Sequence, residues 1–309
     1  MHIFVIFALA GLAAQLVDGS LGMAYGVTST TVLLALGTSP AIASASVHLA
    51  EVGTTLASGA AHWRFGNVDW GVVARIALPG AAGAVLGAYV LTSLSTEAAE
   101  PYMAALLIVL GTYVLLRFSV RAVAATVVRG ARPGSRFLAP LGLVAGFIDA
   151  TGGGGWGPVA TTTLLSSGRL EPRKVVGSVD TSEFVVALAA GTAFLVALQG
   201  QGISWITVAG LLVGGVIAAP FAAWLVRIMP ARLLGTAAGG LIVITNVRTV
   251  LPPAGITGVA ATALFLGLAA LWVVALVSAV RSIRSDRAEV DALTGTGAPV
   301  ATTPRSGSA

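Results

Sequence analysis

Apolar residues run through most of the chain in stretches of about 20, separated by short polar loops. A helix needs about 20 consecutive apolar residues to cross a bilayer. We therefore predict an all-α polytopic membrane protein. Full transmembrane helices are expected at 42–62, 71–93, 101–117, 175–198, 204–226, 233–250 and 257–280.

Two further apolar stretches, 3–36 and 138–167, are too long for one ordinary crossing and too short for two. Glycine next to a carboxylate interrupts both of them. Backbone can leave the helical form at membrane depth only where protein or a water-filled cavity satisfies its polar groups. We interpret each stretch as a broken or re-entrant hairpin made of two half-helices.

The two glycine-rich stretches belong to a duplicated unit. A shift of 131 residues aligns Asp18 with Asp149, and a shift of 132 aligns Glu51 with Glu183. Each repeat is then one hairpin followed by three crossing helices. An odd number of crossings inverts the second repeat relative to the first. Inverted repeats with broken helices are typical of transporters that work by alternating access.

A basic loop separates the two repeats, and a polar tail ends the chain. The expected units are repeat one at 1–117, the cytoplasmic loop 118–136, repeat two at 137–252, an extra transmembrane helix at 253–280 and a tail at 281–309. The tail is rich in Ser, Thr, Gly and Ala, so we expect it to be disordered and cytoplasmic.

Composition supports the membrane assignment and excludes other classes. The chain is 56% hydrophobic and 9% charged, with a mean hydropathy of +0.94, whereas a soluble domain carries about 25% charged residues. There is no cysteine, which excludes a disulfide framework and a thiolate metal site. The net charge of +5 does not indicate nucleic acid, because the arginines lie in short loops between apolar spans.

The distribution of basic residues predicts the orientation. Cytoplasmic loops carry an excess of Lys and Arg. If both glycine stretches are hairpins, all of the 17 basic residues except Arg75 and Arg248 fall on one side. A single crossing at 138–167 would instead place the basic cluster at 169–174 outside. We therefore predict a multi-pass protein of the cell (plasma or inner) membrane, with basic loops and the C-terminal tail in the cytoplasm.

The glycine motifs predict a binding site for an anion. The second half-helix of each hairpin would begin near Gly22 or Gly153, with unpaired N–H groups and the positive end of its dipole. Glycine also lets an oxyanion approach the backbone closely. The alternative is that these glycines only permit close packing of helices. The candidate substrate-binding residues are Gly19, Ser20, Gly22, Gly152, Gly153, Gly154, Gly155, Thr30 and Thr161.

Ionisable residues inside the predicted spans are costly and mark function by default. Three interpretations remain open. The first is proton coupling, above all through Glu51 and Glu183. The second is capping of the half-helices, by Asp18 and Asp149. The third is convergence on a cation, because each of two helices carries two such residues three positions apart. The candidates are Asp18, His48, Glu51, Asp149, Asp180 and Glu183.

The paired motifs resemble those of a known family. They are Asp18-Gly-Ser-Leu-Gly-Met-Ala-Tyr-Gly26 and Asp149-Ala-Thr-Gly-Gly-Gly-Gly-Trp-Gly-Pro158. Together with Pro40 and Pro172, each before a polar-faced span, they resemble the sulfite exporter TauE/SafE family across both halves of the chain. The resemblance implies a multi-pass permease for small sulfur-containing anions such as sulfite, sulfonates or sulfoacetate.

The leading hypothesis is therefore a secondary transporter of small anions that works by alternating access, with the buried carboxylates as candidate proton-coupling groups. The alternative is a divalent-cation or metal permease that uses the intramembrane His/Asp/Glu cluster. We expect no enzyme activity, because the chain has no His-Glu-x-x-His sequence and no cysteine nucleophile. We also expect no cofactor and no resident metal. The expected partners are a small inorganic or organosulfur anion and the lipid bilayer, with homo-oligomerisation left open.

Overall fold

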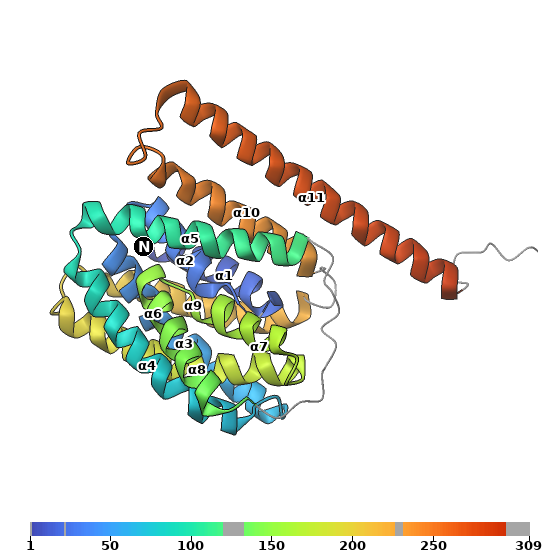
Figure 1. Cartoon of the computed structure of the whole chain (residues 1–309), viewed down its shortest axis with the longest axis horizontal. Helices are drawn as coiled ribbons and strands as arrows, with labels where there is room; N and C mark the ends of the chain where they lie inside the picture. Colours follow the sequence, from blue (N-terminus) through green and yellow to red (C-terminus); the bar gives the residue numbers. More distant parts are fainter. Residues whose placement is uncertain (1, 22, 120–132, 226–230, 295–309) are drawn as a thin grey trace, which may run out of the picture.

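The protein is a bundle of helices that lie mostly side by side (Figure 1). The computed structural model describes residues 2–21, 23–119, 133–225 and 231–294. Within these ranges there is no strand, which confirms the all-α prediction. Part of the predicted loop 118–136 and the end of the tail lie outside the described residues.

The order of elements is the same in the two halves. The first half contains α1 (His2–Leu21), α2 (Tyr25–Ala35), α3 (Pro40–Arg64), α4 (Trp70–Ser93) and α5 (Thr96–Ser119). The second contains α6 (Ser135–Gly152), a short π-helix η1 (Gly157–Thr161) that runs into α7 (Thr162–Ser167), then α8 (Pro172–Ala197), α9 (Trp205–Leu225) and α10 (Ala231–Val250). The final helix is α11 (Gly258–Thr294).

Local sequence explains where the short helical arms end. Gly37 follows α2 and Gly168 follows α7, and both glycines adopt a positive φ, the left-handed conformation that commonly terminates a helix. The next helices begin with Pro40 and Pro172, which suit the first turn because a backbone N–H has no helical partner there. The breaks predicted at 3–36 and 138–167 therefore each give a long arm, an interruption and a short arm.

Close approaches between helices establish their directions in the first half. Ile42 of α3 meets Gly202 just before α9, and Gly53 of α3 meets Leu212 of α9, so α3 and α9 run in the same direction. Gly210 and Gly214 of α9 meet successively later residues of α1, so α1 shares that direction. Since α1 and α3 point the same way, the chain must return between them through α2.

Close approaches also establish the helix directions in the second half. Gly142 of α6 lies against Ile76 of α4, and Gly87 further along α4 lies against Phe147, so α4 and α6 are parallel. The backbone of Asp69 at the start of α4 contacts Ser178, and Gly80 contacts Val186, so α4 and α8 are parallel as well. The chain therefore turns back between α6 and α8 through η1 and α7.

Equivalent helices of the two halves pair with each other in opposite directions. Gly59 of α3 lies against Thr181 of α8, and Gly191 of α8 lies against Leu49 of α3. In the same way α5 pairs with α10, where Gly239 meets Leu115 and Gly111 meets Ile242. The long arm of each hairpin packs on the other half instead, α1 on α9 and α6 on α4.

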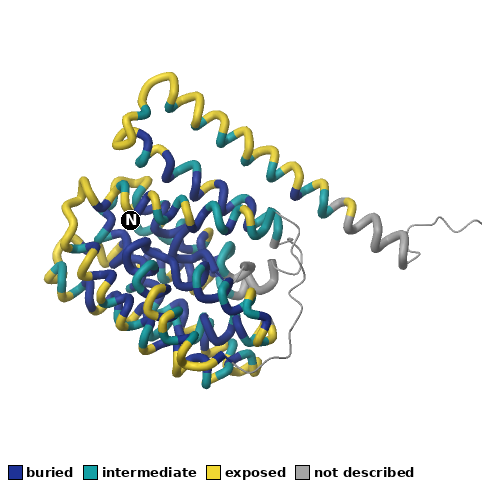
Figure 2. Tube along the Cα trace, in the orientation of Figure 1, coloured by how far each residue is buried: buried dark blue, intermediate teal, exposed yellow. Residues whose placement is uncertain are grey.

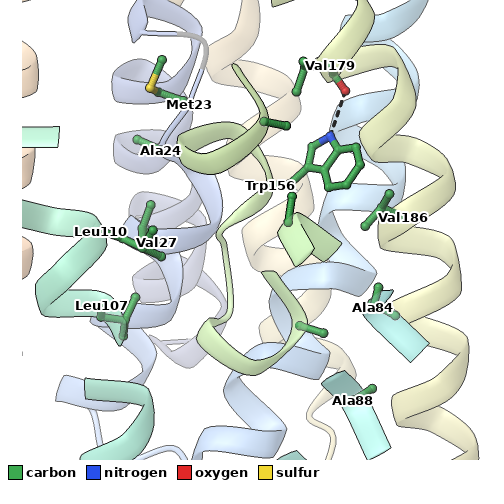
Figure 3. Close-up of a cluster of buried hydrophobic side chains, with 14 of the residues drawn as sticks. Met23, Ala24, Val27, Ala84, Ala88, Leu107, Leu110, Trp156, Val179 and Val186 are labelled. Carbon is green, nitrogen blue, oxygen red and sulfur yellow. Dashed lines mark hydrogen bonds between the residues drawn. The ribbon is translucent and has the colours of Figure 1, made fainter. Parts of the chain in front are cut away.

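Burial is greatest in the centre of the bundle, where the two hairpins lie (Figure 2). A continuous core joins both halves and includes Val27, Ala84, Leu107, Trp156 and Val186 (Figure 3). The Trp156 ring is fully buried there, and its indole N–H donates to the Val179 carbonyl at 3.1 Å.

Five helices among the described residues are long and apolar enough to cross a membrane. They are Trp70–Ser93, Thr96–Ser119, Arg173–Ala197, Arg232–Val250 and Gly258–Ile283, and they coincide with five of the seven predicted full spans. The spans predicted at 42–62 and 204–226 coincide with α3 and α9 but do not meet this criterion. In α3 the reason is its many polar side chains. α9 spans Trp205–Leu225, and its described apolar part covers Trp205–Ala219.

The last helix lies on one edge of the bundle beside α10 (Figure 1). Only 6% of its most apolar stretch is buried inside the bundle. Trp272 joins it to α10 by donating to the Thr236 carbonyl at 3.0 Å. The helix continues past Arg281 to Thr294, so the start of the tail that was expected to be disordered is helical. Arg, Ala, Glu and Leu in this segment are all good helix formers. Residues 295–309 lie outside the described part.

The contact between α4 and α6 predicts a sharp position dependence for glycine substitutions. A Cβ atom on Gly146 would overlap the Gly80 carbonyl oxygen, whereas a Cβ atom on Gly267 of α11 would meet nothing within 4 Å. We expect Gly146→Leu to lower the free energy of unfolding by about 1–3 kcal/mol or more, as overpacking does. Gly267→Leu is the matched control and should be close to wild type in thermal unfolding in detergent. Equal stability of the two variants would contradict the close packing.

Candidate functional site

The breaks in the two hairpins touch each other in the centre of the protein. The backbone of Gly154 lies against Gly26 and the N atom of Val27 so closely that a Cβ atom at position 154 would overlap both residues. Gly154 has a φ of +142° and Gly153 a φ of +69°, conformations that L side chains rarely adopt. Glycine is therefore required here both for conformation and for space.

Asp149 organises the second hairpin. Its Oδ1 atom accepts from the backbone N–H groups of Gly155 at 2.6 Å and Trp156 at 2.9 Å, just before η1. Its backbone carbonyl accepts from Gly153 and Gly154. A carboxylate is well suited to the positive N-terminal end of a helical segment. Four successive N–H groups of the glycine motif are thus satisfied by this one residue.

Asp18 does the same in the first hairpin. Its Oδ1 atom accepts from the N–H groups of Ala24 at 2.6 Å and Tyr25 at 3.1 Å, six and seven residues later. The spacing equals that of Asp149 with Gly155 and Trp156. The capping interpretation of the two aspartates therefore agrees with these contacts. The predicted contact of substrate with the same N–H groups would need the carboxylates to give them up.

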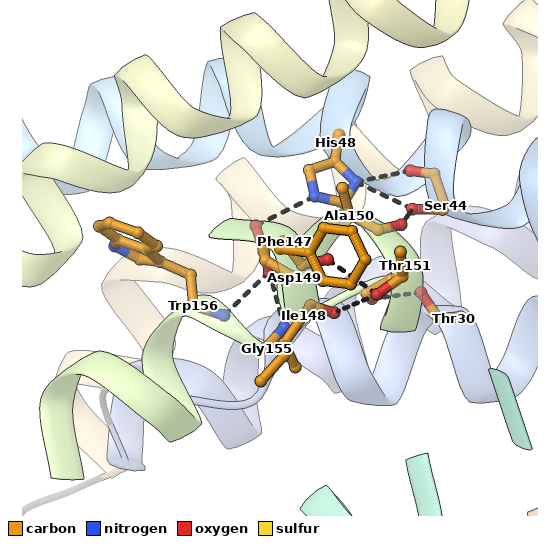
Figure 4. A network of polar contacts seen from close by, with 11 residues as sticks. Thr30, Ser44, His48, Phe147, Ile148, Asp149, Ala150, Thr151, Gly155 and Trp156 are labelled. Carbon is orange, nitrogen blue, oxygen red and sulfur yellow. Dashed lines mark hydrogen bonds and ion pairs between the residues drawn. The ribbon is translucent and has the colours of Figure 1, made fainter. Parts of the chain in front are cut away.

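His48 connects the first half to the second hairpin (Figure 4). Its Nε2 atom lies 3.1 Å from the second carboxylate oxygen of Asp149, and both side chains are almost fully buried. Its Nδ1 atom lies 2.8 Å from the Ser44 carbonyl oxygen. The Ser44 hydroxyl in turn donates to the Ala150 carbonyl at 2.7 Å. This network holds the end of α6 against α3.

A small polar cavity lies beside this network. Its volume is about 10 Å³, which is at the lower limit for one water molecule. Four carboxylates from three helices line it together with neutral polar groups. The lining residues are Gln15, Asp18, Tyr25, Glu51, Thr54, Thr55, Ser58, Asp180 and Glu183. The structure thus brings together four of the six ionisable candidates, while His48 and Asp149 form the neighbouring pair.

Two carboxylate oxygens in this region lack hydrogen-bond partners among the described residues. They are Oε2 of Glu51, whose side chain is 1% exposed, and Oδ2 of Asp180. Burial of an unpartnered polar atom is costly. No three His, Asp or Glu side chains in the described residues are arranged to hold a metal ion. The predicted convergence of His48, Glu51, Asp180 and Glu183 on a metal therefore finds no support in this geometry.

The other candidates are placed as follows. Gly152 is the last residue of α6, and the Thr30 hydroxyl donates to the Gly153 carbonyl, which links the two hairpins. Thr161 is buried in η1. Gly19 and Ser20 lie in the last turn of α1, and Gly22 lies outside the described residues.

The sequence prediction missed most of the neutral lining of the cavity. Ser44, His48, Glu51, Thr55 and Ser58 recur every three or four residues on α3 and so form one polar stripe. The sequence analysis recognised the span after Pro40 as polar-faced, but it did not single out the neutral residues Thr55 and Ser58 of this stripe. The Tyr25 hydroxyl, which donates to the Leu211 carbonyl at 2.9 Å, could not have been found this way, because its partner lies in the other half.

Comparison with known proteins agrees with this organisation. The profile of the family described as sulfite exporter TauE/SafE matches residues 7–249. The chain is also 52% identical over 251 residues to the probable membrane transporter protein YtnM of Bacillus subtilis (strain 168), a match that covers 81% of this chain and 84% of that protein. No solved structure matches the chain.

The contacts of Asp149 predict a large loss of stability when its side chain is removed. Asp149→Ala leaves His48 and two N–H groups without a partner in a buried site, and removal of one member of a buried pair costs about 3–5 kcal/mol. Asp69 is the matched control, because its Oδ1 atom also accepts from two N–H groups but at the partly exposed start of α4. Loss of such a cap costs about 1 kcal/mol. Denaturant unfolding in detergent should separate the two variants, and equal losses would contradict the role of the buried pair.

Proposed function

This chain belongs to the sulfite exporter TauE/SafE family and is a multi-pass membrane transporter, not an enzyme. On that premise we propose that it is a secondary transporter of small sulfur oxyanions such as sulfite or a sulfonate. The observation that carries the proposal is the contact between the two hairpin breaks at Gly26 and Gly154, beside a small polar cavity. A substrate site at the meeting point of two broken helices is typical of secondary transporters.

The two halves are inverted repeats in this proposal. Support comes from the helix pairs α3 with α8 and α5 with α10, in which equivalent helices run in opposite directions. Further support comes from the packing of α1 on α9 and of α6 on α4. Each contact joins the long hairpin arm of one half to the second-to-last helix of the other half, so the two contacts are equivalent. Alternating access would then consist of rocking one hairpin against the other around the fixed centre.

The orientation follows from charge. Arg169, Arg173 and Lys174 lie at the end of the second hairpin, whereas residues 37–41 at the end of the first hairpin carry no charge. An excess of basic residues marks the cytoplasmic side. We therefore assign residues 169–174 and the C-terminal tail to the cytoplasm, and residues 37–41 to the outer face.

Proton coupling explains how an anion can bind in a cavity that is lined by carboxyl groups. An ionised carboxylate only accepts hydrogen bonds, but a protonated carboxyl donates one. An oxyanion can therefore contact Asp18, Glu51, Asp180 or Glu183 only when these groups carry protons. Substrate and protons would occupy the site together. The space between these groups, about 10 Å³, is too small for an oxyanion in this structure, so substrate binding requires the hairpins to move apart.

Flux measurements test the substrate class. Purified protein in proteoliposomes should move sulfite or a sulfonate, with a rate that depends on pH, and should not move divalent metal ions. Gly154→Val should abolish flux while inserting normally, because the added side chain separates the hairpin breaks. Gly267→Val on α11 is the control and should transport at the wild-type rate. Flux of a divalent metal without flux of any sulfur oxyanion would support the cation-permease alternative and overturn the proposal.

Site-specific labelling tests the inverted topology. The chain has no cysteine, so a single introduced thiol is the only one present. In intact cells, a membrane-impermeant maleimide should label Thr38→Cys and leave Arg169→Cys unlabelled. After the membrane is opened, both variants should react. Labelling of both in intact cells would show that the two hairpins end on the same face.

A further inference from the structure

The two halves differ at one pair of equivalent positions. His48 of α3 faces Asp149 of the second hairpin at 3.1 Å. A shift of 132 residues places Asp180 of α8 at the position of His48, and a shift of 131 places Asp18 of the first hairpin at the position of Asp149. Where one half has a histidine and an aspartate, the other half therefore has two aspartates.

The histidine pair holds a proton that its contacts require. Nδ1 of His48 faces the Ser44 carbonyl oxygen and a hydroxyl whose hydrogen is donated to Ala150, so Nδ1 must carry a hydrogen. Nε2 faces a carboxylate oxygen, so a second hydrogen must lie between His48 and Asp149. The pair therefore has no net charge, whichever of the two side chains carries this hydrogen. The buried contact between His48 and Asp149 therefore needs no further ion to balance its charge.

The aspartate pair has no such built-in positive charge. Asp18 and Asp180 line the same small cavity. Ser58 lines the cavity together with Asp180, but Oδ2 of Asp180 has no partner among the described residues. Oε2 of Glu51, on the same cavity and almost fully buried, has none either. A proton stabilises a carboxyl group whose oxygen is buried without a partner, and two neighbouring carboxylates can share one proton.

We propose that Asp18 and Asp180 form the binding site of the coupled proton, and that His48 is a permanent substitute for this proton in the other half. This inference rests on the proposed function. With the proton bound, the two aspartates hydrogen-bond to each other and hold the first hairpin against α8. Without it, their repulsion releases that hairpin. The second hairpin stays held by His48, so only the first hairpin responds to the proton.

Other titratable groups surround the proposed site. Tyr25 on α2, Glu51 on α3 and Glu183 on α8 line the cavity, and the His48–Asp149 pair lies behind Glu51. These groups can exchange a proton with the aspartates but do not replace them, because Asp18 is the carboxylate that caps the first hairpin. Release of the hairpin therefore depends on the charge of Asp18 and its partner.

Infrared spectroscopy tests the site without any substrate. Protonated carboxyls give a separate C=O band, and aspartate labelled with a heavy isotope at its carboxyl carbon shifts the bands of Asp alone. We expect Asp180→Asn and Asp18→Asn each to lose one labelled band, and the double variant to lose no more than either single variant. Glu171→Gln, an exposed carboxylate paired with Arg173 near the start of α8, is the control and should keep the band. Single variants that keep every labelled band of the wild type would overturn the proposal, whereas a band from Asp149 would persist in all variants, including the double one.

Transport measurements test the coupling. Wild-type proteoliposomes that contain a pH indicator should move about one proton with each sulfite ion. Asp180→His, which copies the arrangement of the other half, should reduce that ratio to zero. Thermal unfolding of the variant checks that it is folded, and Asp180→Asn provides a second variant with the same expected loss. Proton movement that persists in both variants, or sulfite flux that requires Na⁺ at constant pH without proton movement, would overturn the inference.

The two experiments separate the inference from the function on which it rests. If no sulfur oxyanion moves but the aspartate band behaves as expected, the proton site stands and the proposed substrate is wrong. If sulfite moves but the band is absent from the wild type, the proposed function stands and the proton site is wrong.

Discussion

The whole arrangement depends on how two helix ends are satisfied in the middle of the protein. A helix that begins inside a membrane protein exposes N–H groups that water cannot reach, and each unpaired group is costly. Asp18 and Asp149 solve this problem in the same way, with one carboxylate oxygen for two N–H groups. This solution places two carboxyl groups in the centre of the protein. The remaining polar groups of the centre are arranged around them.

The two aspartate carboxyl groups have different partners in the two halves. His48 provides a built-in partner for Asp149, whereas Asp18 faces a cavity that contains three more carboxylates. If Asp18 and Asp180 bind the coupled proton as proposed, one half holds its hairpin through His48 while the other half responds to the proton. The close contact of Gly26 with Gly154 connects the two tasks mechanically. A movement of one hairpin therefore displaces the other.

The sequence was enough to predict the helical class, the two interrupted stretches and the equivalence of Asp18 with Asp149. These features depend on hydropathy, span length and internal repetition, all of which are local or periodic properties. It could not predict that His48 meets Asp149, 101 residues later, because that contact depends on how the halves pack. For the same reason the sequence suggested that the glycine N–H groups were free, whereas Asp149 engages them. The polar stripe on α3 was within reach of sequence reasoning through its helical spacing.

The small size of the central cavity has a consequence for the energy balance of the cell. A continuous file of water through a protein conducts protons rapidly, and a carrier with such a path would dissipate the gradient that drives it. The space between the carboxylates is limited to about one water molecule. It therefore has no room for a file of several water molecules among these groups.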